Sequence, residues 1–407
     1  MLENLRSTIR LRPITWDADL RRLERAASIE DLRLIAKKRL PGGVFDYIDG
    51  AAEDERAMAR NHDLFDDLLF RPRVLRDVAH VDTSTTLLGK RIPVPIVLAP
   101  TGFTRIANSQ GELAVARVAR RRGLPYTLSS LATRSIEEVA DVSDGPKWFQ
   151  VYVWRDRGIV KEMVQRAQQA DYEAICITVD LATLGRRERD VRRGFTLPPK
   201  IGLDTIVDGI RHPAWTLDFI RSEPILFANV TGSAATDGTD AVALSEYVKT
   251  QLDPTLSWSD IEWFRQIWDG PIVIKGIQDV ADAKQASEIG IEAIALSNHG
   301  GRQLDAAPAP VELLAEVVDA VGGATQVICD GGIRRGADIA KALALGADAV
   351  MTGRPYLYGL GAAGEAGVDR ACDFLTSELE RTMALIGCSS VRQLDGSAIR
   401  RTTEHPT

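Results

Sequence analysis

Eight short apolar runs recur along the chain from residue 95 onward, and each is separated from the next by enough residues for one helix. The runs are PIVLAP (95–100), PYTLSS (125–130), WFQVY (148–152), AICITVD (174–180), PIVIKG (271–276), AIALSNH (293–299), QVICDGG (326–332) and AVMTGRP (349–355). Runs that are apolar on both faces are typical of parallel strands covered by helices. Intervening segments such as GELAVARVARRRG have helical spacing and end in glycine, a common helix stop. The alternation favours an α/β fold, a closed (β/α)8 TIM barrel, over an open doubly wound sheet.

Three parts of the chain fall outside this repeat. We expect a helical lead-in packed on the barrel at 1–90, the barrel at 91–394 and a C-terminal tail at 395–407. An insertion of about 186–256 follows the fourth strand, and a capping box from Ser259 to Glu262 is expected to start the next helix. A loop this long in a compact domain is usually functional or disordered.

Composition excludes several classes of protein. The formal net charge of −7 over 407 residues argues against a nucleic-acid partner, which requires clustered positive charge. The cysteines show no metal-type spacing, so we expect no metal site and no disulfide framework. These cysteines are Cys176, Cys329, Cys372 and Cys388. No apolar run approaches the roughly 20 residues of a membrane span, and the N-terminus lacks a signal-peptide core. The expected location is cytoplasmic, or peripheral at the inner face of the plasma membrane.

Polar side chains stand at the carboxyl ends of seven of the predicted strands. In chain order they are Ser129 and Ser130; Gln150 and Tyr152; Thr178 and Asp180; Lys275; His299 and Arg302; Asp330, Gly332 and Arg334; Gly353 and Arg354. The active sites of (β/α)8 barrels lie at this end of the strands. So many polar groups on one rim are hard to explain by packing, and they predict a single functional site.

Two features of this rim indicate an anionic, electron-accepting ligand. Lys275 closes a Val/Ile strand, where lysine is rarely buried without a partner, although it could also extend to solvent along the rim. The glycines and arginines of the seventh and eighth loops, with Arg334 and Arg354, are typical of a phosphate site, since glycine allows close backbone approach and arginine supplies a forked donor. The alternative is that these glycines only turn the chain.

His299 is the candidate base. A lone histidine is more often structural, but this one shares the rim with Asp180, which could orient the ring and stabilise its protonated form. Arg187 and Arg302 add two forked cations suited to a substrate carboxylate. The pattern therefore predicts proton abstraction from an acid substrate.

The sequence resembles the FMN-dependent L-2-hydroxy acid oxidoreductases, the glycolate oxidase-like family, from about Leu34 to Leu394. SNHGGRQLD (297–305) resembles the active-site signature of that family. The other motifs of the family also occur in this chain, in the same order along the sequence as in the family. They are FDYIDGAAEDE, APTGFTR, FQVYVWRDR, TVDLATLGRRERD, VIKGI, DGGIRRGADIAKALALGA and GRPYLYGL. Among members of this family, bacterial L-lactate dehydrogenases are the most similar in the insertion.

The resemblance implies roles for individual residues. His299 would be the base, Asp180 its carboxylate partner, Tyr152 a contact of the substrate hydroxyl, and Lys275 the cation beside the flavin. The residues implied in binding the substrate carboxylate are Tyr47, Arg302 and Arg187. The residues implied in holding FMN are Ala99, Pro100, Thr101, Ser129, Gln150, Thr178, Lys275, Ser297, Asp330, Gly332, Arg334, Gly353 and Arg354.

The implied activity is oxidation of an L-2-hydroxy acid to the 2-oxo acid, with L-lactate to pyruvate as the first hypothesis and a quinone or other non-oxygen acceptor. Gly102 stands where simple oxidases of the family usually carry alanine, and Leu131 where plant glycolate oxidase carries an aromatic residue. The alternatives are an oxidase or monooxygenase that uses oxygen, and a dehydrogenase for a larger acid such as mandelate. A barrel that keeps FMN only structurally and serves as a binding partner is a further alternative, which the complete set of rim residues disfavours. The resemblance also implies a homo-oligomer, a tetramer in many relatives. It implies membrane attachment through the apolar stretch 212–230, and the alternative is that these residues pack on the barrel or between subunits.

Overall fold

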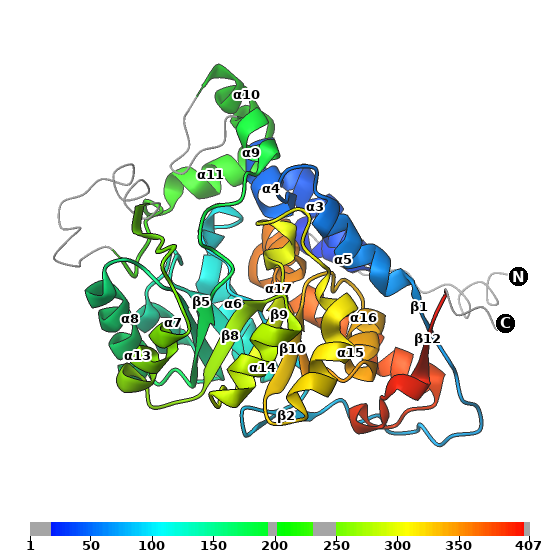
Figure 1. Ribbon diagram of the computed structural model, residues 1–407. Helices are drawn as coiled ribbons and strands as arrows, with labels where there is room; N and C mark the ends of the chain where they lie inside the picture. Colours follow the sequence, from blue (N-terminus) through cyan, green and yellow to red (C-terminus); the bar gives the residue numbers. More distant parts are fainter. Residues whose placement is uncertain (1–17, 194–201, 231–249, 403–407) are drawn as a thin grey trace, which may run out of the picture.

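Eight parallel strands close into a barrel in the computed structural model, which describes residues 18–193, 202–230 and 250–402 (Figure 1). The barrel strands are β4 (Ile96–Leu98), β5 (Tyr126–Ser129), β6 (Lys147–Tyr152), β7 (Ala174–Thr178), β8 (Ile272–Ile277), β9 (Ala293–Ser297), β10 (Gln326–Asp330) and β11 (Ala349–Thr352). Each pairs in parallel with the next, and β11 pairs with β4 to complete the ring. The predicted (β/α)8 barrel is confirmed, and each predicted run coincides with one strand, although β6 and β8 each extend one residue beyond their runs.

Helices cover the outside of the ring. They are α6 (Gly111–Arg122), α7 (Ile136–Val142), α8 (Arg157–Gln169), α13 (Ser259–Ile267), α14 (Val280–Glu288), α15 (Pro310–Val321), α16 (Gly336–Ala344) and α17 (Arg354–Ile386). Gly123 and Gly322 end α6 and α15 in the left-handed conformation, which glycine adopts without steric cost. The long α17 is interrupted at Ala363 and Gly364.

The predicted capping box at Ser259 is wrong. Trp258 is the N-cap residue of α13, it makes no side-chain capping bond, and Ser259 is already the first helical residue. Asp260 instead accepts a hydrogen bond from the Ser257 backbone N–H at 2.9 Å, so its carboxylate closes the turn before the helix. A one-residue shift of the helix start removed the spacing on which the prediction rested.

The interior of the barrel is filled and closed at its amino end. Side chains such as Val97, Trp148, Val273 and Met351 form one buried cluster inside the strands. Leu87 also belongs to it, from a hairpin of β2 (Thr85–Leu87) and β3 (Lys90–Ile92). Because the amino end is plugged, access to the barrel is left to the carboxyl end, where the polar residues stand.

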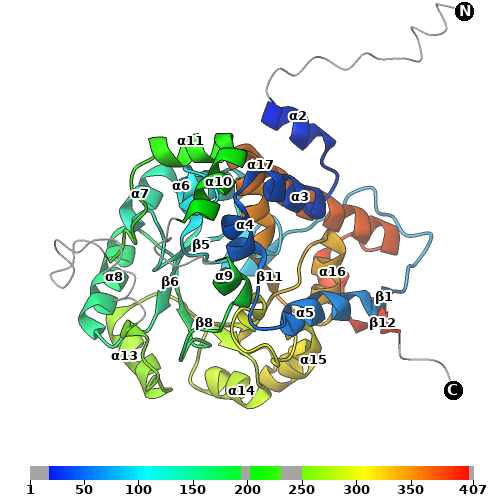
Figure 2. The same ribbon diagram turned by 90° about the horizontal axis from the view of Figure 1, so that it is seen from above.

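The lead-in and the insertion meet over that carboxyl end. The lead-in comprises α2 (Ala18–Arg25), α3 (Ile29–Arg39), α4 (Gly42–Asp49), α5 (Arg56–Asp66) and β1 (Leu68–Phe70), and the insertion includes α9 (Glu188–Arg192), α10 (Leu203–Arg211) and α11 (Pro213–Arg221). In Figure 2 α4 and α9 lie near the barrel axis, seen from above. Arg189 of α9 pairs with the Asp49 carboxylate of α4 at 2.9 Å, which joins the two segments.

The remaining elements are short. Strand β12 (Ile399–Arg401) pairs antiparallel with β1, so the end of the described chain is tied to the lead-in. The 3-10 turns are η1 (Thr104–Ile106), η2 (His299–Gly301), η3 (Val391–Gln393) and η4 (Gly396–Ala398). Within residues 18–193, 202–230 and 250–402, no helix is both long and apolar enough to cross a bilayer.

Candidate active site

A cavity of about 460 Å³ opens at the carboxyl ends of the strands. Most of the predicted site residues line it. They are Tyr47, Ala99, Pro100, Thr101, Tyr152, Thr178, Arg187, Lys275, His299, Arg302, Asp330, Gly332, Arg334, Gly353 and Arg354. Residues from the lead-in, the barrel and the insertion therefore share one site, although up to about 300 residues separate them along the chain.

Four predicted site residues lie behind the cavity wall. Ser129, Gln150 and Ser297 are 2%, 1% and 0% exposed, and the Asp180 side chain is 1% exposed. Each contacts a residue that lines the cavity, directly or through one neighbour. Ser129 donates to the Gln150 amide oxygen at 2.9 Å, and the Gln150 amide nitrogen donates to the Thr178 hydroxyl at 2.9 Å. These side chains hold the lining residues in place, and their direct contact with a cofactor stays a prediction.

His299 and Asp180 form a hydrogen-bonded pair. The Nδ1 atom of His299 lies 3.0 Å from Oδ1 of Asp180. Because a carboxylate only accepts, Nδ1 carries the proton and Nε2 is left as the basic nitrogen. Burial opposes ionisation of Asp180, but the neighbouring His299 and Lys275 outweigh it and keep the pKa of Asp180 below its usual value. Asp180 is thus a fixed anion beside the imidazole.

A buried amide pair holds the loop that carries His299. His299 has a φ of 57°, and Gly300 and Gly301 are also left-handed, so the loop needs external support. Asn298 supplies it by accepting from the Gly301 N–H at 3.1 Å and exchanging two hydrogen bonds of 2.7 and 2.8 Å with Asn61 of α5. Sequence reasoning missed both asparagines, although Asn before the glycine turn was a visible signal for a local cap.

Two guanidinium groups enclose the Tyr47 ring. The Cζ atoms of Arg187 and Arg302 lie 5.3 and 5.2 Å from its centroid. Arg187 is held by Asp190, a residue that sequence reasoning missed, through a 2.8 Å bond from Nε. Burial, with the nearby charge of Arg187, lowers the pKa of Arg302 to about 9. An anion at this place would relieve that repulsion, which fits a carboxylate-binding site.

Lys275 is buried within a polar network. Its Nζ lies 3.0 Å from the Asp330 carboxylate and donates to the Ser297 hydroxyl at 2.9 Å, and Ser297 donates to Asp330 at 2.7 Å. Burial disfavours the charge, but the carboxylates of Asp330 and Asp180 outweigh it and raise the pKa of Lys275 above its usual value. The network therefore keeps a permanent cation at the cavity wall.

The residues of the seventh and eighth strand ends fit a phosphate-bearing cofactor. Within the described chain, neither Arg334 nor Arg354 forms an ion pair with a carboxylate, and both line the cavity. A Cβ atom at Gly332 would lie 2.0 Å from the Asn61 carbonyl oxygen, so only glycine fits there. Thr352 also lines the cavity, and its buried hydroxyl has no partner among the described residues. Two cations without a carboxylate partner at the cavity wall suit an anionic ligand.

The rest of the cavity wall is apolar. Leu131, Leu181, Leu184 and Val191 line it, together with Phe227 from the insertion. Phe227 is 7% exposed, and its ring centroid lies 5.8 Å from that of Phe103. This part of the cavity suits the hydrocarbon side chain of a substrate.

The fold and the site together define a class of protein, a (β/α)8-barrel flavin oxidoreductase that acts on 2-hydroxy acids. An imidazole–carboxylate pair beside two arginines suits proton removal from a substrate that carries a carboxylate, and the buried Lys275 cation with the arginines of the seventh and eighth loops suits a flavin nucleotide. Comparison with known proteins agrees with this class.

The family model described as FMN-dependent dehydrogenase matches residues 36–401. A Mycobacterium tuberculosis protein provisionally named L-lactate dehydrogenase is 45% identical over 93% of this chain and 90% of its own length. Glycolate oxidase of Spinacia oleracea is 42% identical over 93% of this chain and 97% of its own length. The crystal structure of the monotopic membrane protein (S)-mandelate dehydrogenase superposes with a TM-score of 0.89, at 39% identity, covering 93% of this chain and all of that one.

The chain belongs to the FMN-dependent dehydrogenase family. Its cofactor is FMN, and its reaction is the oxidation of a 2-hydroxy acid. The resemblance found in the sequence is therefore confirmed at the level of the family, its cofactor and its class of reaction.

Proposed function

We propose that this protein is an L-2-hydroxy acid dehydrogenase that oxidises L-lactate to pyruvate and passes the electrons to a quinone or another non-oxygen acceptor. The observation that carries the proposal is the placement of His299, with Asp180 hydrogen-bonded behind it, in the same cavity as Arg187, Tyr47 and Arg302. Lactate as the substrate is supported by the name of the mycobacterial relative, which matches nearly the whole chain.

In this proposal each side chain has a distinct role. Arg302 and Arg187, with Tyr47 between them, bind the carboxylate of the substrate and fix its orientation. Tyr152 contacts the substrate hydroxyl, and burial raises its pKa above the usual value, so that it remains a neutral donor. Nε2 of His299 takes the proton, and Asp180 stabilises the imidazolium that results.

FMN, when bound, accepts the two electrons that leave the substrate. Lys275 stabilises the negative charge that accompanies reduction, because its own charge is held by Asp330 and Asp180. Arg334 and Arg354 hold the phosphate, and the loop with Gly332 gives it close backbone approach. Ala99, Pro100 and Thr101 support the flavin ring at the end of β4. The hydrogen bonds that link Ser129, Gln150 and Thr178 hold the wall beside it.

A larger acid such as mandelate is the second candidate substrate. It is favoured by the apolar wall around Leu131 and by Gly102, which leaves space at the end of β4. A methyl group at position 102 would lie 3.1 Å from Cβ of Leu131 and 3.2 Å from its carbonyl oxygen. Alanine would therefore press on Leu131 and narrow this side of the cavity. The solved structures of mandelate dehydrogenase and mandelate oxidase support this candidate.

A substrate panel tests both candidates. The FMN-loaded protein is mixed anaerobically with glycolate, L-lactate, a branched L-2-hydroxy acid and (S)-mandelate, and bleaching of the flavin absorption is followed. Fastest bleaching by L-lactate supports the proposal, fastest bleaching by mandelate supports the second candidate, and bleaching by none overturns both. Reoxidation by a quinone-like dye much faster than by oxygen supports the dehydrogenase, and the reverse supports an oxidase or monooxygenase.

A membrane-facing surface on the insertion also belongs to the proposal. Ile210 of α10 and Leu217 and Ile220 of α11 are 72%, 50% and 70% exposed, on helices that stand above the barrel beside α9 in Figure 1. Such a surface suits the interface of a lipid bilayer, where a lipid-soluble acceptor resides. The monotopic mandelate dehydrogenase supports this reading. Other parts of the 212–230 stretch pack on the barrel, since Phe227 is buried and the Trp215 indole N–H donates to the Ile106 carbonyl at 2.8 Å.

A further inference from the structure

One buried hydroxyl joins two of the residues that line the cavity at the end of β4. Tyr356, in the first turn of α17, is 1% exposed. Its hydroxyl donates to the Ala99 carbonyl oxygen at 2.6 Å and lies 2.7 Å from the Thr101 hydroxyl. Thr101 Oγ1 is also 3.0 Å from the hydroxyl of Thr104, which donates to the Thr101 carbonyl oxygen. Three hydroxyl groups and two carbonyls therefore share three protons.

The distances decide where these protons lie. Two oxygens 2.6 Å apart need a proton between them, and a carbonyl cannot provide it, so the Tyr356 proton points to Ala99. Burial raises the pKa of Tyr356 far above its usual value, and the hydroxyl keeps this proton at any working pH. The 2.7 Å contact between Tyr356 and Thr101 must then be donated by Thr101. The Thr101 hydroxyl has no proton left for the cavity and can only accept from it.

An acceptor at this place distinguishes the two redox forms of a flavin. The reduced ring carries more N–H groups than the oxidised ring, whose corresponding ring nitrogen is itself an acceptor. We propose that Tyr356 is a positioning residue that fixes the Thr101 hydroxyl as a hydrogen-bond acceptor toward the flavin and thereby favours the reduced form of the cofactor. This inference rests on the proposed placement of the flavin ring beside Thr101.

The Tyr356→Phe variant removes the hydroxyl while keeping the ring volume. The Thr101 proton then loses its 2.7 Å acceptor, and since the Thr104 hydroxyl is more distant at 3.0 Å, the proton becomes available to the oxidised ring. One hydrogen bond of ordinary strength shifts an equilibrium by about tenfold. For a two-electron couple this corresponds to a midpoint potential about 30 mV more negative. The potential is measured by anaerobic reductive titration against a reference dye, so that no substrate is required.

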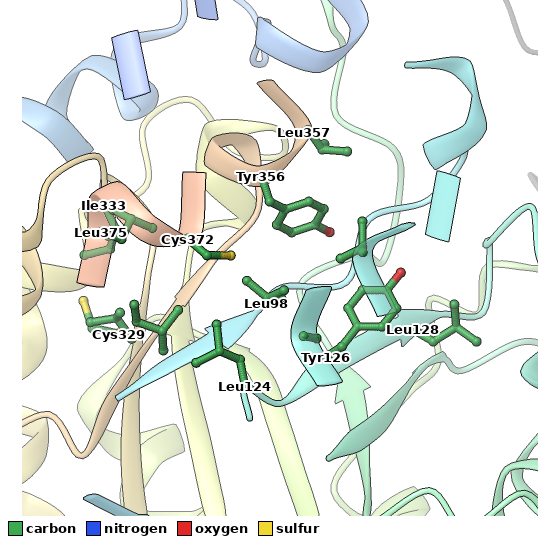
Figure 3. Packing of buried hydrophobic residues seen from close by; sticks show 14 of the residues in the cluster. Leu98, Leu124, Tyr126, Leu128, Cys329, Ile333, Tyr356, Leu357, Cys372 and Leu375 are labelled. Atoms are coloured by element: carbon green, nitrogen blue, oxygen red, sulfur yellow. The ribbon is translucent and has the colours of Figure 1, made fainter. Parts of the chain in front are cut away.

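The chain offers a matched control in Tyr126. Tyr126 of β5 is also 1% exposed and lies in the same apolar layer near Leu98 (Figure 3). Its buried hydroxyl has no hydrogen-bond partner among the described residues. Tyr126→Phe therefore removes a hydroxyl of the same kind without changing the Thr101 network, and its potential should equal that of the parent protein.

A double-mutant cycle tests whether the effect passes through Thr101. Thr101→Val removes the hydroxyl with little change in volume, and Tyr356→Phe added to it should cause no further shift. The proposal is overturned if Tyr356→Phe leaves the potential unchanged, shifts it equally in the Thr101→Val background, or prevents FMN binding altogether. If Thr101→Val alone changes neither the potential nor the flavin spectrum, the placement of the ring beside Thr101 is wrong. That last result is independent of which acid the enzyme oxidises.

Discussion

Asp180 and His299 lie 119 positions apart in the chain, yet Oδ1 of Asp180 is 3.0 Å from Nδ1 of His299. The carboxylate comes from the segment after β7, and the imidazole from the turn η2 after β9. Gly276, at the end of β8 between them, makes the approach feasible, since a Cβ atom there would lie 2.8 Å from Cβ of Asp180. The barrel thus brings together a candidate base and its carboxylate partner, a pair that neither strand specifies alone.

Replacing His299 by glutamine should stop flavin reduction while FMN remains bound. Glutamine has a similar volume but cannot take the proton, and general base catalysis contributes roughly 10²–10⁴-fold. Anaerobic stopped-flow absorbance with the best acid of the substrate panel measures the rate. His80→Gln, at an exposed position, is the control. An unchanged rate in His299→Gln would mean that another group is the base.

Replacing Arg302 by lysine should raise KM for the acid by about 10–100-fold although the charge is kept. Lysine lacks the planar fork that grips a carboxylate, and a charge-assisted hydrogen bond contributes about 1.5–3 kcal/mol. Nη1 of Arg302 alone makes the bonds of 2.8 and 2.9 Å to the Tyr47 and Gly50 carbonyl oxygens, and the single nitrogen of lysine would have only one hydrogen left for the carboxylate after making them. Steady-state kinetics measure KM for the acid, and Arg56→Lys, at an exposed position, is the control. Near-parental KM and flavin-reduction rate would assign carboxylate binding to another residue.

Replacing Asn61 by leucine should slow flavin reduction and lower stability together. The variant removes two hydrogen bonds of the buried Asn298 amide, which keeps only those with Gly301 and Pro308, and each lost bond contributes about 0.5–1.5 kcal/mol. The loop with His299 in its left-handed conformation then loses part of its support. Chemical denaturation and stopped-flow reduction are the measurements. A stable variant with a normal reduction rate would show that the amide pair does not position His299.

The stability of the FMN-free protein should fall as the pH drops from about 6.5 to about 4, in part because of His62. Burial, with the charges of Arg334 and Arg354, lowers the pKa of His62 to about 4. In this range the unfolded chain binds a proton that the folded protein excludes, so stability decreases with decreasing pH. The shift corresponds to on the order of 3 kcal/mol at full extent. Denaturation at several pH values should show a weaker dependence in His62→Gln, and an identical dependence would contradict the assignment.

Replacing Ile210, Leu217 and Ile220 by serine should release the protein from lipid vesicles without slowing flavin reduction. These side chains are exposed, so their loss costs little folding stability, whereas deletion of the whole stretch would remove Phe227 and Trp215 from the barrel packing. Binding through apolar burial should also resist salt. Co-sedimentation with phosphatidylcholine vesicles measures the binding. The control is Ile289→Ser, which changes an exposed residue at the end of α14. Failure of the parent protein to sediment would contradict membrane attachment.

The sequence by itself determined the barrel and the end at which its site lies. Eight runs apolar on both faces can only be buried between layers, and the polar residues that end them meet on one rim because parallel strands finish at the same edge. For that reason Lys275, His299 and Arg354 could be assigned to one cavity from their positions alone. The family resemblance added Tyr47, which no local pattern marks.

Tertiary structure decided which residues face the cavity and which support them. Ser129, Gln150 and Ser297 follow the same strand-end pattern as Thr178, but their side chains lie behind the wall. Asn61 contacts Asn298, 237 positions away, and Tyr356 contacts Ala99, 257 positions away. No periodic pattern in the sequence predicts either contact. Sequence patterns record the local alternation of buried and exposed positions. Contacts of this range depend on how whole helices pack on the barrel, so only the assembled structure contains them.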